Sequence, residues 1–321
     1  MHFPITRKII LKENIECDFK NQDSYVYTKK EEKIEKIKEE IEALKTIGFD
    51  SEFISKNELP FKALAAIKFK NQAQFNIMKY LIGLANCIEN NNGKIFEKTK
   101  VYDLKKENDK YLVFFEDGIV ECQNVIIATH YPIFNSPGFY FLKMYQSMSY
   151  AIALETNNDI PEGIYISSDN PKISIRTIDV NKKNKMIVIV GNDHKTGESN
   201  NGDNYKELEK IAKSVYPDCK ITYRWSTEDC ITLDKIPYIG EFSKFMPNVY
   251  VATGYNKWGI TTSNIAANII KDKILKKDNK YGIINTNNET IIDFNYTNLV
   301  YRKTADFIEG VKTAEETDLI N

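Results

Sequence analysis

The segment NVYVATGYNKWGITTSNIAANII, residues 248–270, has the pattern of a strand that leads through a short loop into a helix. Val249 and Val251 are β-branched and apolar, as is typical of a buried strand. From Thr262 onward, apolar residues repeat at the spacing of one helical face. The candidates for the helix N-cap are Thr261, Thr262 and Ser263. Since the free N–H groups of a first helical turn favour negative charge, this junction predicts a site for an anionic group.

Two apolar strands of similar sequence predict where this site lies in the fold. VIIAT at residues 125–129 and VYVAT at residues 249–253 both end in Ala-Thr. Short, wholly apolar runs are typical of parallel strands that are buried on both faces. In doubly wound sheets, ligands bind beyond the carboxyl ends of such strands. Residues 144–193, between the two runs, have the pattern of antiparallel strands, so the sequence predicts a second domain inserted into the first.

The composition excludes several classes of function. The chain of 321 residues carries 44 Lys and Arg against 45 Asp and Glu, so it lacks the basic excess of a nucleic-acid-binding protein. Its five cysteines form no C-x-x-C pair and it has three histidines, which argues against a metal site or a disulfide scaffold. Neither a signal peptide nor an apolar run long enough to cross a membrane is found. We therefore expect a cytoplasmic protein of two domains.

Periodicity predicts further elements outside the two apolar strands. Residues 29–47 and 76–92 are amphipathic and predict helices, of which the first has a dimeric coiled coil as its alternative. Another helix is expected at 203–216. Short strands are predicted at 94–96, 99–104, 111–115 and 119–122, with a turn at Asp117-Gly118. The region beyond residue 277 is polar, with one helix predicted near 303–312.

Several segments, in a fixed order over roughly residues 15 to 275, resemble one protein family. They are CDFKNQDSYVYT (17–28), ELPF with AIKFKNQAQF (58–61 and 66–75), VIIATHYP (125–132), ISIRT (173–177), GNDHKTGE (191–198), WSTEDCITLDKIPYIG (225–240) and ATGYNKWGITTS (252–263). Together they are similar to the FAD-dependent oxidoreductases of the D-amino-acid oxidase (DAO) family, which includes glycine oxidase and sarcosine oxidase. The similarity extends to a bacterial branch that often carries a C-terminal Rieske domain.

The resemblance implies an α/β fold with two interleaved domains. An FAD/NAD(P)-binding Rossmann-like domain, lacking its first βαβ unit, would alternate along the chain with an antiparallel-sheet substrate domain. The implied segments are a helical part of the substrate domain (1–75), an FAD-domain segment (76–138), the antiparallel substrate domain (139–235), the C-terminal FAD-domain segment (236–277) and a polar extension (278–321).

The resemblance also implies which residues hold the cofactor. The helix N-terminus near Gly259 would face N1 and the C2 carbonyl of the flavin, where negative charge builds when the flavin accepts a hydride. The residues implied to contact FAD are Val101, Ala128, Thr129, Gly240, Gly254, Tyr255, Trp258, Gly259, Ile260 and Thr261. The alternative is an ordinary capped strand–helix junction, with Trp258 as a core residue.

Three residues are implied to meet the substrate, an amine or amino acid. Lys257 stands where relatives carry a cation that supports the flavin or meets the substrate carboxylate. Arg176 is a candidate for the same carboxylate, because an inward arginine needs an anionic partner. Gln74, with Gln72 beside it, is expected to point toward the flavin from the substrate side. The alternatives are a surface salt bridge for Arg176 and solvated or core positions for the two glutamines.

One departure from the family pattern affects the cofactor site. Such folds begin with a strand, a G-x-G-x-x-G turn and a helix. The 14 glycines of this chain form no G-x-G triplet. By comparison with the family, on the order of 100 residues, including the first βαβ unit, are expected to be missing from the N-terminal side. The Rieske cysteine–histidine pairs are missing as well, since the last cysteine is Cys230 and the last histidine is His194. We therefore expect weak FAD binding, or none, by this chain alone.

Three functions are consistent with these observations. The first is an FAD-dependent amine or amino-acid oxidoreductase that is incomplete without a nucleotide-binding segment. The second is a non-catalytic remnant, or a subunit completed by a partner chain that carries G-x-G-x-x-G. The third, a nicotinamide-dependent enzyme, is disfavoured by the same missing fingerprint.

Overall fold

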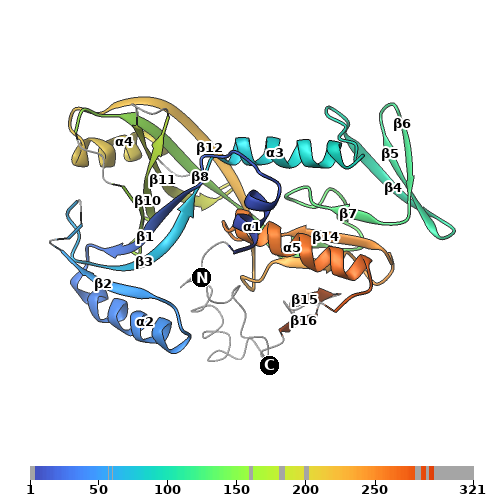
Figure 1. Cartoon of the computed structure of the whole chain (residues 1–321), viewed down its shortest axis with the longest axis horizontal. Helices are drawn as coiled ribbons and strands as arrows, with labels where there is room; N and C mark the ends of the chain where they lie inside the picture. Colours follow the sequence, from blue (N-terminus) through green and yellow to red (C-terminus); the bar gives the residue numbers. More distant parts are fainter. Residues whose placement is uncertain are drawn as a thin grey trace. The chain divides into compact units, whose positions relative to one another are not determined.

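The computed structural model describes residues 4–56, 58–59, 61–158, 162–180, 185–198, 202–278, 283–286 and 289–292. The chain divides into two compact units, each built from separate pieces of sequence (Figure 1). The large-sheet unit contains Asp18–Asn76 and Ser147–Glu228. The strand-helix unit contains Pro4–Cys17, Ile77–Gln146 and the residues from Asp229 onward.

Eight strands form one mixed sheet in the large-sheet unit, in the order β12-β8-β11-β10-β9-β1-β3-β2. Their bounds are β1 Lys20–Thr28, β2 Ser51–Ser55, β3 Ala65–Gln74, β8 Met144–Glu155, β9 Ile164–Ser167, β10 Ile173–Asp179, β11 Lys185–Lys195 and β12 Lys220–Thr232. β1 runs parallel to β9, whereas β1 with β3, β2 with β3, and β9 with β10 are antiparallel. β8, β10 and β11 are also antiparallel neighbours. One end of β8 and one end of β12 continue into the strand-helix unit.

Helices pack on both faces of this sheet. α4 (Asn204–Val215) buries Leu208 and Ala212 in a core with strand residues such as Ile152 and Ile189. α2 (Ile34–Thr46) follows the short 3-10 helix η1 (Glu31–Lys33) and buries Ile37, Ile41 and Leu44. α2 contacts β2 and β3, and Phe49, just beyond the helix, packs edge-on against Phe69 of β3. Each fully buried Leu or Ile contributes about 1.5–3 kcal/mol relative to an exposed one.

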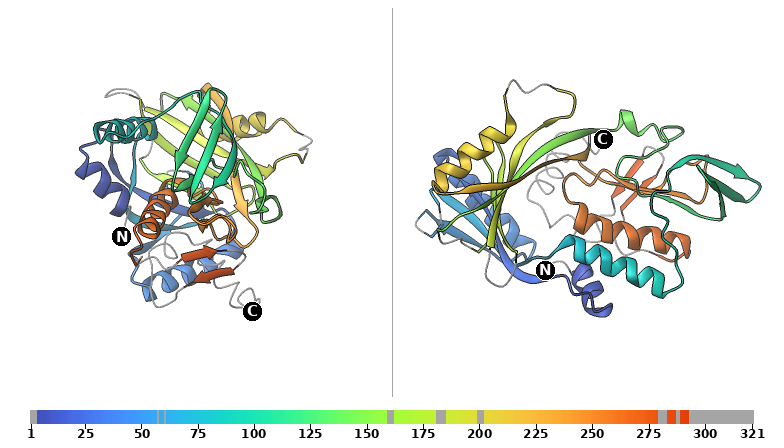
Figure 2. Two further views of the ribbon diagram at one scale, coloured as in Figure 1. Left: turned by 90° about the vertical axis from the view of Figure 1, so that its right-hand side faces the viewer. Right: turned by 90° about the horizontal axis from the view of Figure 1, so that it is seen from above.

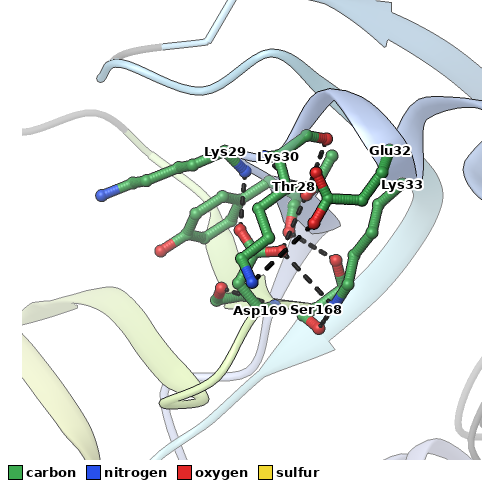
Figure 3. Close-up of polar contacts among 9 residues, drawn as sticks. Thr28, Lys29, Lys30, Glu32, Lys33, Ser168 and Asp169 are labelled. Carbon is green, nitrogen blue, oxygen red and sulfur yellow. Dashed lines mark hydrogen bonds and ion pairs between the residues drawn. The ribbon is translucent and has the colours of Figure 1, made fainter.

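A buried carboxylate ties the start of α2 to the strands (Figure 3). Asp169, which is 7% exposed, accepts hydrogen bonds from the Thr28 hydroxyl at 2.8 Å and from the backbone N–H of Lys29 at 2.7 Å. Lys33 of η1 places its Nζ 3.4 Å from the same carboxylate and also donates to the carbonyl of Ser168. Burial alone would raise the pKa of Asp169, but these hydrogen bonds and the lysine charge lower it below its usual value.

The strand-helix unit is built around the three-stranded sheet β13-β14-β7. β7 (Val125–Ile127) is parallel to β14 (Val249–Thr253), and β13 (Tyr238–Glu241) is antiparallel to it. The remaining elements are α1 Pro4–Lys12, α3 Ile77–Asn90, β4 Val101–Glu107, β5 Lys110–Phe115, β6 Gly118–Cys122, η2 Tyr140–Leu142, α5 Gly259–Ile274, β15 Ile283–Thr286 and β16 Glu289–Ile292. β4, β5 and β6 form an antiparallel meander.

Each face of β14 has its own core. α5 packs Ile265 and Ile269 on one face, against Tyr250 and Ala252. On the other face, Val249 and Val251 pack in a cluster with residues of β7, the meander and η2. All five residues of β14 are therefore buried, as the apolar run predicts. In β7 the same prediction is wrong, because the side chain of Ile126 is 51% exposed.

Most elements expected from periodicity are confirmed, and three expectations are wrong. The helices predicted at 29–47, 76–92 and 203–216 correspond to α2, α3 and α4, and Gly48 follows α2 with φ at +71°. Residues 94–96 form no strand. The interval 1–75, predicted as helical, contains β1, β2 and β3, whose many polar residues hide the strand pattern. The turn predicted at Asp117-Gly118 lies one residue earlier, since Phe115 pairs with Gly118. The helix predicted near 303–312 lies outside the described residues.

The unit boundaries also differ from the predicted segment boundaries. Residues Pro4–Cys17 belong to the strand-helix unit because α1 contacts α5, where Asn264 donates to the Thr6 hydroxyl at 3.1 Å. Two unit boundaries fall inside the continuous strands β8 and β12. The sequence pattern of a strand gives no sign of such a boundary. The assignment of the segments to cofactor and substrate roles stays a prediction. In the described part of the chain, no helix is both long enough and apolar enough to cross a membrane.

Candidate functional site

The carboxyl ends of β7 and β14 lie at the same edge of the three-stranded sheet. Val125 pairs with Val249 and Ile127 with Val251, so the chain leaves both strands at one level. The Thr253 hydroxyl, at the end of β14, donates to the carbonyl of His130, just beyond β7. The two Ala-Thr strand ends are thus joined directly, which places the loops that follow them next to each other.

A hydrogen-bonded asparagine fixes the loop after β14. The Asn256 side chain accepts from the backbone N–H of Thr232 at 2.9 Å and donates to the carbonyl of Lys235 at 2.8 Å. Gly254 has φ at +72°, and a Cβ there would lie 2.4 Å from Cγ2 of Thr232. Glycine is therefore required for both backbone and space. The loop that carries the predicted cofactor residues is held against the end of β12.

The N-terminus of α5 opens at this edge without a side-chain cap. The N-cap is Trp258, which makes no capping side-chain hydrogen bond, and the first turn contains no acidic residue. A Cβ at Gly259 would meet no atom within 4 Å, and Ile260 is 41% exposed. These N–H groups form a positive end that is open to a ligand.

The predicted N-cap is wrong, because the helix begins before all three candidates. Gly259 and Ile260 already adopt helical conformation, so Thr261 and Ser263 lie inside the first turn. Their hydroxyls donate back along the helix, from Thr261 to the Trp258 carbonyl at 3.3 Å and from Ser263 to the Ile260 carbonyl at 3.2 Å. Because they lie inside the helix and bond back to preceding carbonyls, these hydroxyls do not cap the free N–H groups of the helix start.

The other predicted residues of this loop differ in exposure. Tyr255 is half-buried, and it packs on the core beneath α5, where burial raises its pKa to about 12. Lys257 is exposed and has φ at +71°, an uncommon conformation for a lysine. Trp258 is 38% exposed, so the alternative of a core tryptophan is not what the structure shows. Lys257 thus adds a positive charge two residues before the helix begins.

The remaining predicted cofactor residues lie on other elements of the same unit. Ala128 and Thr129 follow β7 directly and are exposed. Gly240 lies in β13 opposite Val251, with φ at +146°. Val101 begins β4 of the meander, which is a separate sheet from β13-β14-β7. The structure therefore gathers the 128–129 and 254–261 residues at one edge and places Val101 in a different sheet.

Arg176 and Gln74 lie in the large-sheet unit, whereas the residues described so far belong to the strand-helix unit. Ile173 and Ile175 of β10 point into the core beneath α4, and the alternation of the strand turns Arg176 to the opposite face. There its cross-strand partner is Val188, which is buried in a small apolar cluster. Arg176 is exposed and, among the described residues, makes no ion pair. The alternative of a surface salt bridge therefore has no support in the described part of the chain.

Polar amides share that face of the sheet with Arg176. Alternation along β1 places Gln22 there, and Gln22 pairs with Gln72, two residues before Gln74. Gln74 Oε1 is buried and, within the described residues, has no hydrogen-bond partner. An unsatisfied buried carbonyl is costly, which marks Gln74 as a residue that a donor from a ligand would stabilise.

Two features of the site were not recognised in the sequence. Thr253 and Asn256 connect the loops, and only the repeated Ala-Thr ending hinted at a shared role. Lys143 lies with Nζ 5.3 Å from the ring centre of Tyr140 and 5.7 Å from that of Tyr238. Tyr238 pairs with Thr253, so this cation lies near the same sheet edge, and burial lowers its pKa. Among the described residues, no group of His, Cys, Asp or Glu could hold a metal ion.

Comparison with known proteins gives consistent matches. The family model described as "DAO: FAD dependent oxidoreductase" matches residues 4–273. The chain is 36% identical over 279 residues to the putative Rieske 2Fe-2S iron-sulfur protein YhfW of Bacillus subtilis, covering 87% of this chain and 55% of the relative. It is 24% identical over 229 residues to the probable oxidoreductase OrdL of Haemophilus influenzae, covering 66% and 50%. The chain thus spans about half the length of the curated relatives it matches.

Solved structures share the fold. Glycine oxidase from Geobacillus kaustophilus superposes with a TM-score of 0.73 at 15% identity, covering 86% of this chain and 76% of that chain. L-proline dehydrogenase from P. horikoshii superposes with a TM-score of 0.70 at 16% identity, covering 86% and 78%. The mixed α/β fold of this chain is therefore that of these structures.

Proposed function

This chain belongs to the DAO family of FAD dependent oxidoreductases, and from that membership we propose that it takes part in the oxidation of an amine or amino acid. The observation that carries the proposal is the open, uncapped N-terminus of α5 at the carboxyl ends of two parallel strands. When bound there, FAD would accept a hydride at N5 from the carbon that bears the substrate amine.

The described residues fit the redox end of a flavin. The first-turn N–H groups of α5 and the Lys257 cation would stabilise negative charge that develops at N1 and C2=O. Gly259, whose absent side chain leaves open space, permits a ring to approach the backbone. Trp258 and Ile260 are half exposed beside it and would provide apolar contact.

The large-sheet unit would bind the substrate. Arg176, exposed on a sheet face and without an ion pair in the described residues, would hold a substrate carboxylate in a charge-assisted hydrogen bond. Gln74 Oε1, buried and unsatisfied within those residues, would accept a hydrogen bond from the substrate amine. Each contact would help to orient the substrate, and this positioning is what the protein contributes to hydride transfer. The solved relatives are named as acting on glycine and L-proline, which supports an amino-acid substrate.

The diphosphate of FAD has no corresponding glycine-rich loop among the 321 residues, which contain no G-x-G triplet. We propose that a βαβ segment from outside these residues supplies this loop, and that FAD binds weakly to the chain alone. A chain that has lost catalysis and only binds a partner is the competing proposal.

Flavin titration and reduction test the proposal. FAD is added to the purified chain, with and without a βαβ segment from a relative, and bound flavin is followed by fluorescence and absorbance. We expect a flavin that is bleached anaerobically by an amino acid. Arg176→Met should raise the KM for a carboxylate substrate about 10–100-fold, because a charged hydrogen bond is lost, and should leave that for a plain amine unchanged.

Arg224→Met is the matched control, since Arg224 pairs with Glu209 on the surface of the same unit. If the flavin binds under either condition but no amine or amino acid bleaches it, the competing proposal of a non-catalytic chain is favoured. Equal effects of the two arginine substitutions would contradict the role of Arg176.

A further inference from the structure

β2 is an edge strand of the large sheet, and within the described residues it pairs with β3 alone. The backbone N–H of Ser55 donates to the Glu58 side chain at 3.2 Å, and the Ser55 carbonyl accepts from the Glu58 N–H at 3.1 Å. Both backbone groups of Ser55 thus point away from β3. In an antiparallel strand this orientation recurs at every second residue. The N–H and C=O groups of Phe53 and Ser51 therefore also point outward, where another strand could pair with them.

A surface cavity lies beside this edge. Its volume is about 700 Å³, a size typical of ligand sites, and it is bounded by α2 and β2. These two elements lie together at the border of the sheet (Figures 1 and 2). Ile54 points into the core beneath α4, so alternation turns Ser51 and Phe53 to the opposite face. Phe53 lines the cavity and is 41% exposed, which leaves an aromatic ring open to contact at the centre of the edge strand.

The cavity also contains a buried hydroxyl that lacks a partner. Ser51 lines the cavity, and its Oγ is buried and has no hydrogen-bond partner in the described part of the chain. A buried polar atom of this kind is costly unless a bound group satisfies it. Ile41 of α2 adds an apolar side chain to the lining. The cavity therefore combines apolar contact with one unsatisfied polar atom, beside a strand edge that can accept a peptide.

The charge at this edge is negative. Residues 50–58 contain three acids and one lysine. Of the five charged side chains that line the cavity, four are already in ion pairs. The pairs are Lys38 with Glu35, Lys45 with Glu42 and Lys70 with Glu52. The fifth, Glu58, makes no ion pair within the described residues and accepts hydrogen bonds from Ser55. A basic group is therefore what this carboxylate lacks.

We propose that the β2 edge and the cavity beside it bind an extended, basic peptide segment of a partner protein. The segment would add a strand to β2 through the outward backbone groups of Ser51 and Phe53. Its apolar side chains would enter the cavity against Phe53, and an arginine or lysine would meet Glu58. A polar group that enters the cavity would satisfy Ser51 Oγ. The inference does not depend on the proposed function, because none of these residues is assigned to the cofactor or the substrate.

A second copy of this chain fits the edge less well. In a two-fold antiparallel pair centred on Phe53, Ser51 of one copy would lie opposite Ser55 of the other. Glu58 already occupies the backbone groups of Ser55, so such a pair would be limited to the hydrogen bonds of Phe53. It would also bring the acidic stretch 50–58 against itself, and like charges that face each other are destabilising.

Binding of a defined peptide to the full chain tests the inference. The probe is a short, labelled peptide in which valine alternates with arginine. The same peptide with glutamate in place of arginine tests the charge, and a version with an N-methylated backbone tests the strand pairing. We expect fluorescence anisotropy to show binding of the arginine peptide alone. Hydrogen exchange should then show protection of the Ser51 and Phe53 amides.

Two substitutions and a matched control locate the site. Phe53→Thr should weaken binding about fivefold or more, because apolar contact is lost while threonine still suits a strand. Glu58→Gln should weaken binding about threefold, which is the effect of one exposed ion pair. Tyr223→Thr should leave binding unchanged, since Tyr223 is 60% exposed on β12, the edge strand at the other end of the same sheet.

Several results would overturn the inference. It is wrong if the arginine peptide does not bind, or if the glutamate or N-methylated peptide binds as tightly. Equal effects of Phe53→Thr and Tyr223→Thr would show that the peptide binds elsewhere. If the chain alone is a dimer that Phe53→Thr dissociates, the edge serves a second copy and not a basic peptide.

Discussion

The two units differ in how completely their apolar surface is covered. Of the 25 large apolar side chains that are exposed among the described residues, four lie in the large-sheet unit and 21 in the strand-helix unit. The large-sheet unit has helices on both faces of an eight-stranded sheet. The strand-helix unit has a three-stranded main sheet with an open edge at β7. Because binding a large cofactor needs uncovered surface, this difference agrees with our proposal that the cofactor binds to the strand-helix unit.

The largest expected effect is a difference in stability between equivalent leucines in the two units. Leu208 is fully buried beneath α4, and Leu81 is 49% exposed on α3. Leu208→Ala should lower the free energy of unfolding by about 3 kcal/mol because it leaves a cavity. Leu81→Ala should change it by less than about 0.5 kcal/mol. The measurement is urea unfolding followed by tryptophan fluorescence.

The chain offers one tryptophan as a reporter in each unit. Trp225 lies in the large-sheet unit and Trp258 in the strand-helix unit, so Trp258→Phe and Trp225→Phe each leave a single reporter. We expect the Trp258 signal to change at lower urea than the Trp225 signal. Coincident transitions, together with equal losses for the two alanine substitutions, would show that the units are equally well packed.

The second prediction concerns the buried carboxylate of the large-sheet unit. Asp169→Asn should lower stability at pH 7 by about 2 kcal/mol, because hydrogen bonds to a charged acceptor are replaced by weaker ones. The pKa of Asp169 is lowered in the folded chain, so its charge stabilises the fold above the unfolded carboxyl pKa of about 4. That stability is lost as the pH falls through the folded pKa, and the difference from the variant should then shrink.

Asp179→Asn is the matched control, since Asp179 is 45% exposed and lies 3.7 Å from Lys20 in the same unit. It should cost less than about 0.5 kcal/mol, with little dependence on pH. A pH-independent effect of Asp169→Asn would show that the residue acts by packing rather than by charge.

The same contrast explains what the sequence could predict. β14 and α5 were predictable, because β14 is a wholly apolar run and the apolar residues of α5 from Ile265 to Ile270 lie on one buried helical face. The exposure of Ile126 was not predictable, because an apolar run does not show whether another strand lies beside it. β1 and β3 were missed because bulges and polar residues such as Gln72 and Gln74 break their alternation. The N-cap was misplaced because Thr261 and Ser263 have capping side chains, yet the backbone turns helical at Gly259.

The site residues divide in the same way. Ala128, Thr129 and the 254–261 loop lie at one edge of the sheet because parallel strands bring their carboxyl ends together, whereas their contact with a cofactor stays a prediction. Asn256 could not be recognised, since its hydrogen bonds reach Thr232 and Lys235, more than 20 residues away in sequence. The roles of Lys257, Arg176 and Gln74 stay predictions, because they depend on a cofactor and a substrate.

The smallest expected effect compares the N-termini of two helices. α4 is capped by Asp203, which accepts from the N–H groups of Tyr205 and Lys206, whereas α5 has no side-chain cap. Asp203→Ala should therefore destabilise the large-sheet unit, by less than Leu208→Ala or Asp169→Asn does.

At the uncapped N-terminus of α5, Gly259→Asp should add a favourable charge. The Gly259→Asp variant should be about 0.5 kcal/mol more stable than the Gly259→Ala variant, because a carboxylate is stabilised by the positive end of α5. The same carboxylate would occupy the place that we assign to the developing negative charge of a flavin. In the chain supplied with a βαβ segment, Gly259→Asp should thus weaken flavin binding more than Gly259→Ala does. Both variants replace the same glycine, but only the first adds a negative charge. Equal flavin affinity in these two variants would show that the positive end of α5 is not the part of the chain that meets the cofactor.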